Sequence, residues 1–292
     1  MRRVAALLLA CAIAAAAGLT SAASQPPRAP QRIVSLVPAL TELLFAIGAG
    51  PQVVGVSSYD HEPPEVESRA RVGALLDPDT ERIIALRPDL VAIYGSQADL
   101  RTQLQRAAIP IFDYRHAGLA DIFTTTRALG AATGHAGDAA DLVRRIEQRI
   151  TAVRARTGRG PRVRTLLVFG REAGALRNIY VSGGRGFLHD MLVAAGGENV
   201  MADVAQESVQ ASTELILARA PDAILEIRDR GALPEDRLQA LAGDWSRLAS
   251  VPAVRAGRVH IVSGTGLTVP GPRVAAAIER LAVALHPHRM TP

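Results

Sequence analysis

Lysine is absent from the 292-residue sequence, and cysteine occurs only once, at Cys11. Without a second cysteine the chain cannot build a disulfide framework. Without lysine it cannot complete a P-loop, which places a lysine on the phosphates of a nucleotide. Aromatic residues make up only 3% of the chain, which disfavours a surface that stacks nucleic-acid bases. These absences exclude disulfide chemistry and P-loop nucleotide hydrolysis, and they argue against nucleic acid as a partner.

Residues 1–23 have the pattern of a secretory signal peptide. Two arginines open the segment, an apolar run covers residues 4–17, and small residues follow. The polar residues after this run come too early for a membrane-spanning anchor, so we expect cleavage near Ala23 and export to the periplasm. Lipid attachment at Cys11 is an alternative, although ten residues before the thiol are few for that kind of signal. Loss of the two arginines lowers the formal net charge from +5 to about +3, too little to favour nucleic acid.

The remaining sequence is organised as two similar halves. Runs of β-branched residues alternate with helical patterns in residues 32–134 and again in residues 162–287, which predicts two α/β lobes with mainly parallel sheets. Between them, residues 135–157 carry apolar side chains at three- and four-residue spacings with arginines between, the pattern of one long amphipathic helix. We therefore expect two lobes joined by that helix, with a ligand cleft between them and little lobe closure.

One segment is written twice in the chain. Residues 80–94 read TERIIALRPDLVAIY, and residues 213–227 read TELILARAPDAILEI. In each copy a polar residue that can cap a helix, Asp79 or Ser212, precedes the segment, and a proline ends the helical part before a strand. The two copies are identical at the paired positions Thr80 and Thr213, Glu81 and Glu214, Ile83 and Ile216, Ala85 and Ala218, Pro88 and Pro221, and Asp89 and Asp222.

The repeated glutamates, Glu81 and Glu214, allow two interpretations. Each is expected in the first turn of its helix, where the helix dipole favours a carboxylate, so folding alone can explain the pair. Alternatively, two symmetric carboxylates on one face suit two arginines of a two-fold symmetric partner. The residues by themselves leave both interpretations open.

Several segments together resemble a known family. They are RIVSLVPALTELLFAIGAG, VVGVSSYDHEPPEV, FLHDMLVAAGGENV and the two repeated segments. Over nearly all of residues 32–285 the chain resembles the helical-spine substrate-binding proteins of ABC importers, which carry cobalamin, ferric siderophores or haem, and most of all the cobalamin-binding members. The resemblance implies a monomeric periplasmic receptor, without catalytic activity or a resident cofactor, that delivers a large metal-containing ligand to an inner-membrane permease dimer with its ATPase subunits. It also implies that Glu81 and Glu214 dock onto arginines of that permease.

Candidate ligand contacts follow the predicted strands, because ligands of α/β lobes lie at the carboxyl ends of the strands. The resemblance matches Tyr59 to a corrinoid-contacting tyrosine and residues 265–269 to a corrinoid-contacting loop. Leu75 stands where the relatives have a tryptophan, and the loop has small and aliphatic residues where the relatives have aromatic and acidic ones. The complete predicted set is Tyr59, Leu75, Tyr94, Phe169, Arg171, Thr265, Gly266, Leu267, Thr268 and Val269.

A ferric siderophore or haem would use other side chains. An anionic chelate needs cations, which Arg171, Arg185 or Arg228 could supply. Haem needs an axial tyrosine or histidine. The candidates for that axial ligand are Tyr59, His61, Tyr94 and His116.

Two rival classes of protein remain. A secreted α/β enzyme would need converging titratable residues, yet the sequence has no G-x-S-x-G elbow, and the two prolines of HEPPE break the helix that an HExxH zinc site requires. A ligand sensor would pass its signal to a receptor instead of a permease. Two residues of the second half have structural expectations: Trp245 should pack a helix on the second sheet, and Glu226, a charge in an apolar strand, should lie at a sheet edge or a strand end.

Overall fold

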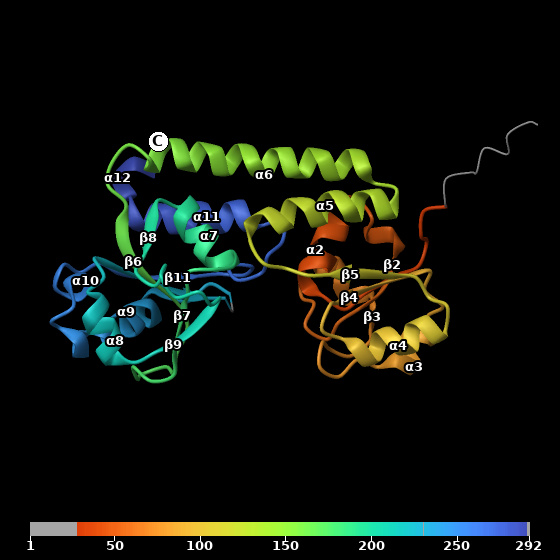
Figure 1. Cartoon of the computed structure of the whole chain (residues 1–292), viewed down its shortest axis with the longest axis horizontal. Helices are drawn as coiled ribbons and strands as arrows, with labels where there is room; N and C mark the ends of the chain where they lie inside the picture. The colour runs from red at the N-terminus through yellow and green to blue at the C-terminus, as the bar shows by residue number, and fades with distance from the viewer. Residues whose placement is uncertain (1–27, 230, 291–292) are drawn as a thin grey trace, which may run out of the picture.

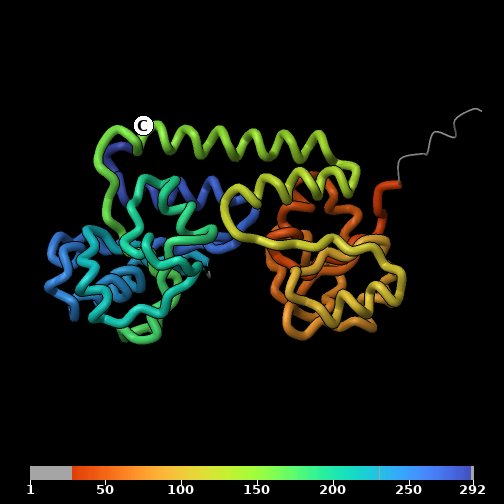
Figure 2. The backbone as a smooth tube through the Cα atoms, viewed as in Figure 1, coloured from red at the N-terminus to blue at the C-terminus, as the bar shows by residue number. Residues whose placement is uncertain are grey.

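The computed structural model describes residues 28–229 and 231–290. The signal peptide predicted for residues 1–23, and Cys11 with it, lies outside these residues. Two α/β lobes stand next to each other under one long helix, α6 (Ala136–Thr157), which runs across both of them (Figure 1, Figure 2). The predicted fold class, two α/β lobes joined by a long helix, is confirmed.

The amino-terminal lobe is built on a five-stranded parallel sheet with the strand order β3-β2-β1-β4-β5. The central strands β1 and β4 are buried at nearly every position, which explains their continuous apolar runs. The strands of this lobe are β1 (Ile33–Ser35), β2 (Val53–Val56), β3 (Ala70–Arg71), β4 (Leu90–Tyr94) and β5 (Ile111–Tyr114), and its helices are α2 (Pro38–Ala46), α3 (Thr80–Ala85) and α4 (Ala98–Arg106).

The carboxy-terminal lobe has a six-stranded mixed sheet with the order β11-β10-β6-β7-β9, and β8 also pairs with β6. Strand β7 runs antiparallel to both of its neighbours, a reversal that the sequence did not predict. It arises because residues 171–178 join β6 to β7 with too few residues for a crossover helix. The strands are β6 (Val163–Gly170), β7 (Ile179–Ser182), β8 (Gly197–Asn199), β9 (Ser208–Ala211), β10 (Ala223–Arg228) and β11 (Val259–Ser263), and the helices are α7 (Phe187–Ala194), α8 (Thr213–Arg219), α9 (Glu235–Gly243), α10 (Pro252–Arg255), α11 (Val274–Leu285) and α12 (Pro287–Met290).

Helix α6 packs on a second layer of helices, α5 (Leu119–Thr133) over the first lobe and α11 over the second (Figure 1). Arg149 of α6 donates two hydrogen bonds, of 2.9 and 2.7 Å, to the carboxylate of Glu279 on α11. No helix within the described residues, α6 included, has the length and apolarity needed to span a membrane. The apolar side chains that predicted this helix are all buried: Leu142, Ile146, Ile150 and Val153.

The repeated segments occupy equivalent places in the two lobes, as α3 followed by β4 and as α8 followed by β10. The predicted helix caps are confirmed. The carboxylate of Asp79 accepts a 2.9 Å hydrogen bond from the backbone N–H of Arg82, and the hydroxyl of Ser212 accepts a 3.2 Å bond from that of Leu215. Each cap satisfies one N–H of the first turn that has no partner inside the helix.

The two helices also end alike, in a way that the sequence did not reveal. Arg87 and Ala220 follow α3 and α8 with positive φ angles of 47° and 44°. An arginine of each lobe then binds the carbonyl end of the helix. Arg32 donates two bonds, of 2.9 and 2.7 Å, to the carbonyl of Leu86, directly after α3. Arg164 donates to the carbonyls of Arg219, the last residue of α8, and of Ala220, both at 2.8 Å. The duplication therefore extends to backbone conformation and to helix capping.

Replacing Ala220 with glycine should stabilise the protein. A left-handed conformation costs a residue with a Cβ about 1–2 kcal/mol, and the greater freedom of glycine in the unfolded chain offsets about 0.4–1 kcal/mol of that gain. We expect the free energy of unfolding, measured by chemical denaturation, to rise by about 0.5 kcal/mol. The control is Ala218→Gly inside the same helix, which should lower it by about 1 kcal/mol. Equal losses of unfolding free energy for Ala220→Gly and Ala218→Gly would show that the left-handed conformation of Ala220 costs no stability.

Candidate functional site

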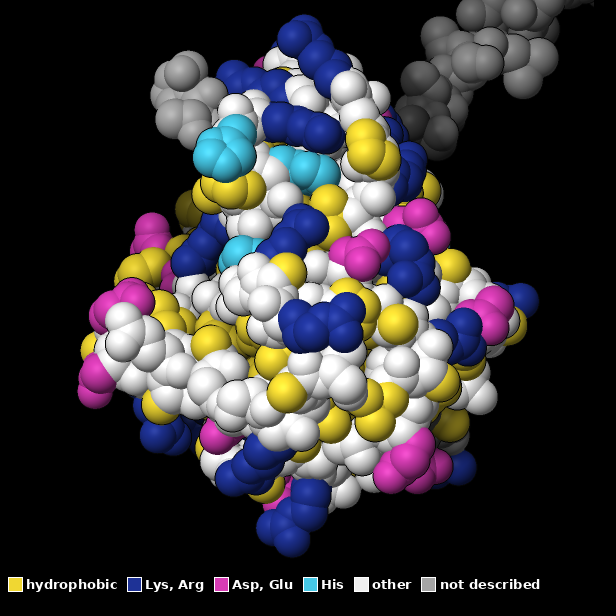
Figure 3. All heavy atoms as spheres, turned by 90° about the vertical axis from the view of Figure 1, so that its left-hand side faces the viewer, with side chains coloured by type: hydrophobic (Ala, Val, Ile, Leu, Met, Phe, Trp, Pro, Cys, Tyr) yellow, Lys and Arg dark blue, Asp and Glu magenta, His cyan; other side chains and the backbone are white. Residues whose placement is uncertain are grey.

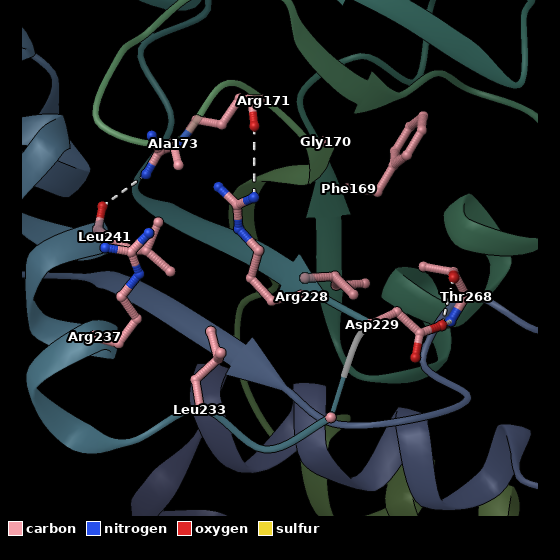
Figure 4. Close-up of a pocket in the computed structure, with 12 residues that line it drawn as sticks. Phe169, Gly170, Arg171, Ala173, Arg228, Asp229, Leu233, Arg237, Leu241 and Thr268 are labelled. Atoms are coloured by element: carbon pink, nitrogen blue, oxygen red, sulfur yellow. Dashed lines mark hydrogen bonds between the residues drawn. The ribbon is translucent and has the colours of Figure 1, made fainter.

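The lobes face each other across a cleft that both of them line. A cavity of about 460 Å³ lies between them. A second cavity of about 570 Å³ lies on the carboxy-terminal lobe (Figure 4). It adjoins the first, because Asp229 and Gly231 line both. The first cavity is lined from the amino-terminal lobe by Pro38, Glu42, Tyr59, His61 and Glu62, and from the other lobe by Asp229, Gly231, Thr265, Gly266, Val269 and Arg273.

Tyr59 belongs to a loop after β2 that is fixed by buried polar groups. The carboxylate of Asp60, which is 1% exposed, accepts a 2.7 Å hydrogen bond from the backbone N–H of Ser57. The guanidinium of Arg71 donates to the carbonyl oxygens of Ser57 and Asp60. Tyr59 itself is 69% exposed and lines the cavity between the lobes.

Asp60 should titrate well above the usual range of an aspartate. Burial, opposed by hydrogen bonds from Thr41 and Ser57, raises the pKa of Asp60 from 3.8 to about 6. Because the folded-state pKa is the higher one, this group stabilises the fold fully below pH 4, and the contribution, about 3 kcal/mol, is lost as the pH rises through 6. We expect the ¹³C resonance of the Asp60 carboxyl group to titrate with a midpoint near 6.

The control for this titration is Asp60→Asn, which keeps an acceptor oxygen but cannot ionise. The free energy of unfolding of this variant should fall less than that of the wild type between pH 4 and pH 8. Parallel pH profiles, or a carboxyl midpoint below 4.5, would contradict the prediction.

Leu75, in the loop between β3 and α3, and Tyr94, the last residue of β4, are held together by Gln97. The side-chain amide of Gln97 accepts from the backbone N–H of Tyr94 and donates to the carbonyl of Leu75, both at 3.0 Å. Leu75 is 39% exposed, whereas the ring of Tyr94 packs edge-on against Tyr114 with 5.6 Å between centroids. Neither is among the described residues that line the two cleft cavities.

Arg171 was expected to reach ligand, but its guanidinium is buried inside the carboxy-terminal lobe. Its side chain is 0% exposed. It donates to the carboxylates of Glu226 and Asp244, each at 2.9 Å, and to the carbonyl of Leu241 at 2.8 Å. These partners occupy the guanidinium. Arg171 still lines the second cavity, although its side chain is 0% exposed. Phe169, two positions earlier, does line that cavity, and its ring points away from the arginine network (Figure 4).

The expectation for Glu226 was wrong. It lies in β10, which pairs with β6 on one side and β11 on the other, and it is 1% exposed. The charge is tolerated there because its carboxylate accepts from Arg171, from Nε of Arg228 at 2.7 Å and from Nε1 of Trp245 at 2.8 Å. Trp245 is fully buried in the core of the second lobe, as predicted.

The loop predicted to contact ligand, residues 265–269, reaches the cleft with most of its members. Thr265, Gly266 and Val269 line the interlobe cavity, and Thr268 lines the second one. The backbone N–H of Thr268 is held by Asp229 at 2.8 Å. Leu267 is 1% exposed and belongs to the hydrophobic core, so its side chain does not meet the cleft as expected.

An ion pair between the lobes was missed by the sequence reasoning. Arg273, just before α11, donates two hydrogen bonds to Glu42 of α2, at 2.9 and 2.7 Å, and a third to Thr265 at 2.9 Å. Glu42 is 6% exposed, and burial raises its pKa against the opposing effect of Arg273. The one available signal was a charge at an otherwise apolar stretch of helix, PALTELLFA. This pair joins the two walls of the cleft directly.

Two residues considered for siderophore or haem lie apart from these cavities. His116 is packed between Tyr114 and Phe187, at centroid distances of 6.2 and 5.6 Å, and both of its ring nitrogens are buried without a hydrogen-bond partner. Burial lowers the pKa of His116, so its ring is neutral at physiological pH. Arg185 is exposed and lines a separate hollow near the start of α7.

The two repeated glutamates are exposed at the starts of their helices. Glu81 on α3 and Glu214 on α8 lie on the side of the lobes that faces away from α6 (Figure 1). Hydrogen bonds from its own backbone N–H and from Ser212 lower the pKa of Glu214, which keeps the carboxylate ionised at neutral pH. Both residues are therefore placed where a partner on that side can reach them.

A hollow of about 710 Å³ lies at the opposite end of the carboxy-terminal lobe from the cleft. Arginine and histidine side chains gather on this end of the molecule (Figure 3). The hollow lies at the amino ends of β6, β10 and β11, whereas the cleft lies at the carboxyl ends, so it is no part of the cleft. Its charged and imidazole side chains are those of Arg162, Asp222, Arg258, His260, His286, His288 and Arg289.

Within residues 28–229 and 231–290 no three histidine, aspartate or glutamate side chains come close enough to hold a metal ion. The cleft instead combines one exposed phenol, one exposed imidazole, small and apolar residues, three arginines that pair with glutamates, and the exposed Arg237. Such an arrangement can hold a large molecule by surface contact and hydrogen bonds.

A family described as periplasmic binding protein matches residues 33–263 of the chain. Among curated proteins, the chain is 32% identical to a vitamin B12-binding protein of Salmonella typhimurium over 225 residues, which are 76% of this chain and 80% of that protein. It is also 29% identical over 265 residues to an uncharacterized ABC transporter substrate-binding lipoprotein, YvrC, of Bacillus subtilis, with 88% and 81% of the two chains covered.

Solved structures show the same two-lobed fold. The periplasmic vitamin B12 binding protein BtuF of Vibrio cholerae superposes with a TM-score of 0.74 at 24% identity, covering 89% of this chain and 98% of that one. The periplasmic heme-binding protein RhuT of Roseiflexus superposes with a TM-score of 0.72 at 26% identity, covering 89% and 99%.

Proposed function

The chain belongs to the periplasmic binding protein family, and from that premise we propose that it is the corrinoid receptor of an ABC importer. It captures a cobalamin-type ligand between its lobes in the periplasm and delivers it to an inner-membrane permease dimer that ATPase subunits drive. The similarity to a vitamin B12-binding protein over 76% of the chain supports this choice of ligand. The role requires no reaction on the ligand.

The charge balance of the cleft is the observation that carries the choice of ligand. Four arginines line the two cavities, and three of them are paired with a buried glutamate: Arg171 and Arg228 with Glu226, and Arg273 with Glu42. The fourth, Arg237, is exposed on α9. An anionic ferric siderophore would find three of these four cations already paired with buried carboxylates. A corrinoid has a broad apolar face and a rim of uncharged amides, so it needs surface contact and hydrogen bonds rather than free cations.

The walls of the cleft offer that kind of contact. Phe169 and Leu233 line the cavity of the second lobe. Gly266 and Val269 of the loop, with Tyr59 across from them, line the cavity between the lobes. Large flat ligands gain affinity from the apolar area that such walls bury, with polar groups at the edge fixing their orientation.

Haem is the second candidate, and one observation favours it. The phenol of Tyr59 and the imidazole of His61 are both exposed on the amino-terminal wall of the cleft, where either could become an axial ligand of the iron. The structural similarity to a heme-binding protein at 26% identity is consistent with this alternative.

Replacing Tyr59 with phenylalanine separates the two ligands. If the ligand is a corrinoid, the variant keeps the ring and its contact area, so the affinity for cyanocobalamin should change less than threefold, whereas an axial phenolate ligand to haem would be lost and the affinity for haemin would fall at least tenfold. The measurement is a titration of wild type and Tyr59→Phe with both compounds by absorbance. If haemin binds tightly only when the Tyr59 hydroxyl is present, and cyanocobalamin does not bind, the ligand is haem and the corrinoid proposal is wrong.

For delivery, we propose that Glu81 and Glu214 dock onto the permease. Their placement at equivalent points of two similar lobes, exposed and on the same side, supports a partner with two-fold symmetry. Their first-turn position also contributes to the helices themselves, and the two roles are compatible.

A further inference from the structure

Helices α3 and α8 expose more than their glutamates in common. On each helix an aliphatic residue three positions after the glutamate, and an alanine four positions after it, are also exposed. Positions three and four apart lie on one face of a helix, so each helix presents a single patch made of a carboxylate, an aliphatic side chain and a small residue. The two patches are Glu81, Ile84 and Ala85 on α3, and Glu214, Leu217 and Ala218 on α8.

The match extends to the degree of exposure. Ile84 is 41% exposed and Leu217 is 40% exposed, and both are among the few large apolar side chains on the described surface. The residue before each of them, Ile83 or Ile216, is completely buried and anchors its helix to the lobe. An isolated exposed aliphatic residue needs no explanation, but the same exposure at the same position of a duplicated helix points to a shared requirement.

The two helices that carry the patches lie on the same side of the molecule (Figure 1). Helices α3 and α8 lie on the side of their lobes away from α6 (Figure 1), and no described residue forms an ion pair with Glu81 or Glu214. A partner that approaches this side and has two equivalent halves can engage both patches at once, because the patches occupy equivalent places in two similar lobes.

We infer that each half of the permease dimer recognises a composite docking site, in which Ile84 or Leu217 fills an apolar pocket next to the cation that binds the glutamate. This inference rests on the proposed function. A second copy of this chain is a poor occupant, because pairing like patches would bring glutamate against glutamate. Exposed ion pairs contribute little affinity on their own, whereas an aliphatic side chain that becomes buried beside the charge can act as an anchor.

The test compares two double variants for binding to the permease–ATPase complex in lipid nanodiscs, by surface plasmon resonance. Ile84→Ser/Leu217→Ser removes the aliphatic groups and keeps both glutamates, and Glu81→Ala/Glu214→Ala does the reverse. We expect each double variant to bind the complex at least tenfold more weakly than wild type. Burying one such aliphatic group is worth roughly tenfold in affinity, and without the glutamate the permease cation is buried in the complex with no partner for its charge. Val283→Ser is the matched control, because Val283 is 50% exposed on α11, away from this side.

The outcomes separate this inference from the proposed function. Weakening by the glutamate variant alone would overturn the composite site and leave the glutamate docking intact. Wild-type affinity in both variants, or no binding of wild type to the complex, would overturn the docking proposal and the inference together. Affinity for cyanocobalamin, measured on every variant, should stay at the wild-type value, and a loss there would show that the serine substitutions act through the fold and overturn the inference.

Discussion

Replacing Glu226 with alanine should lower the free energy of unfolding by about 3–5 kcal/mol, the largest loss expected from any single substitution considered for this chain. The carboxylate is 1% exposed and binds Arg171, Arg228 and Trp245. Its removal leaves the guanidinium of Arg171, which is 0% exposed, with a reduced set of acceptors inside the lobe. An uncompensated buried charge is what makes the loss large. Chemical denaturation followed by circular dichroism measures the change.

Two further variants test that explanation. Glu172→Ala removes an exposed partner of Arg177 and should change the stability by less than about 1 kcal/mol. Glu226→Leu combined with Arg171→Met removes the two most buried charges of the network and should recover part of the loss, because a buried pair replaced by apolar residues of similar size is often neutral. Asp244 and Arg228 lose a partner, but their side chains are 16% and 22% exposed and keep contact with solvent. A Glu226→Ala loss below 1 kcal/mol would show that the buried network contributes little.

The ion pair between Glu42 and Arg273 should show strong energetic coupling across the cleft. A double-mutant cycle with Glu42→Gln and Arg273→Met is expected to give an interaction energy of about 1–3 kcal/mol, since the carboxylate is 6% exposed and accepts two hydrogen bonds. The side chain of Arg273 is 31% exposed, and solvent screening keeps the value below that of a fully buried pair. The measurement is the stability of the four proteins.

The chain supplies a matched control for this cycle. Arg149 and Glu279 form a hydrogen-bonded pair of similar geometry on the spine, but their side chains are 48% and 35% exposed. A double-mutant cycle on Arg149 and Glu279 should give an interaction energy of less than about 1 kcal/mol. Equal coupling energies at the two pairs would mean that burial between the lobes adds nothing to the Glu42–Arg273 interaction.

Local patterns explain how much of the fold could be predicted from the sequence. The apolar stripe of α6, the capping residues Asp79 and Ser212 and the alternation of strands and helices depend on neighbours within a few residues, and all of them are found in the structure. The antiparallel strand β7 was missed because its direction depends on a short hairpin whose pairing is set by the rest of the sheet.

Long-range pairing explains what could not be predicted about the site. Glu42 and Arg273 are 231 residues apart, and Arg171 and Glu226 are 55 apart, so no spacing rule connects them. A matched position in a loop also does not determine which way a side chain points, which is why Leu267 lies in the core while Thr265 lines the cleft. The exposure of Tyr59, Glu81 and Glu214 was accessible to sequence reasoning, because a loop residue or a residue in the first turn of a helix usually lies at the surface.

Isothermal titration of the purified mature protein with cyanocobalamin tests the central claim most directly. The matched variant is Thr265→Trp, which places a large ring in the cavity between the lobes at an exposed position. We predict binding of one cyanocobalamin per wild-type chain with a dissociation constant in the micromolar range or below, and at least tenfold weaker binding to the variant. No heat of binding with wild type, or equal affinity in both proteins, would contradict a corrinoid site in the cleft.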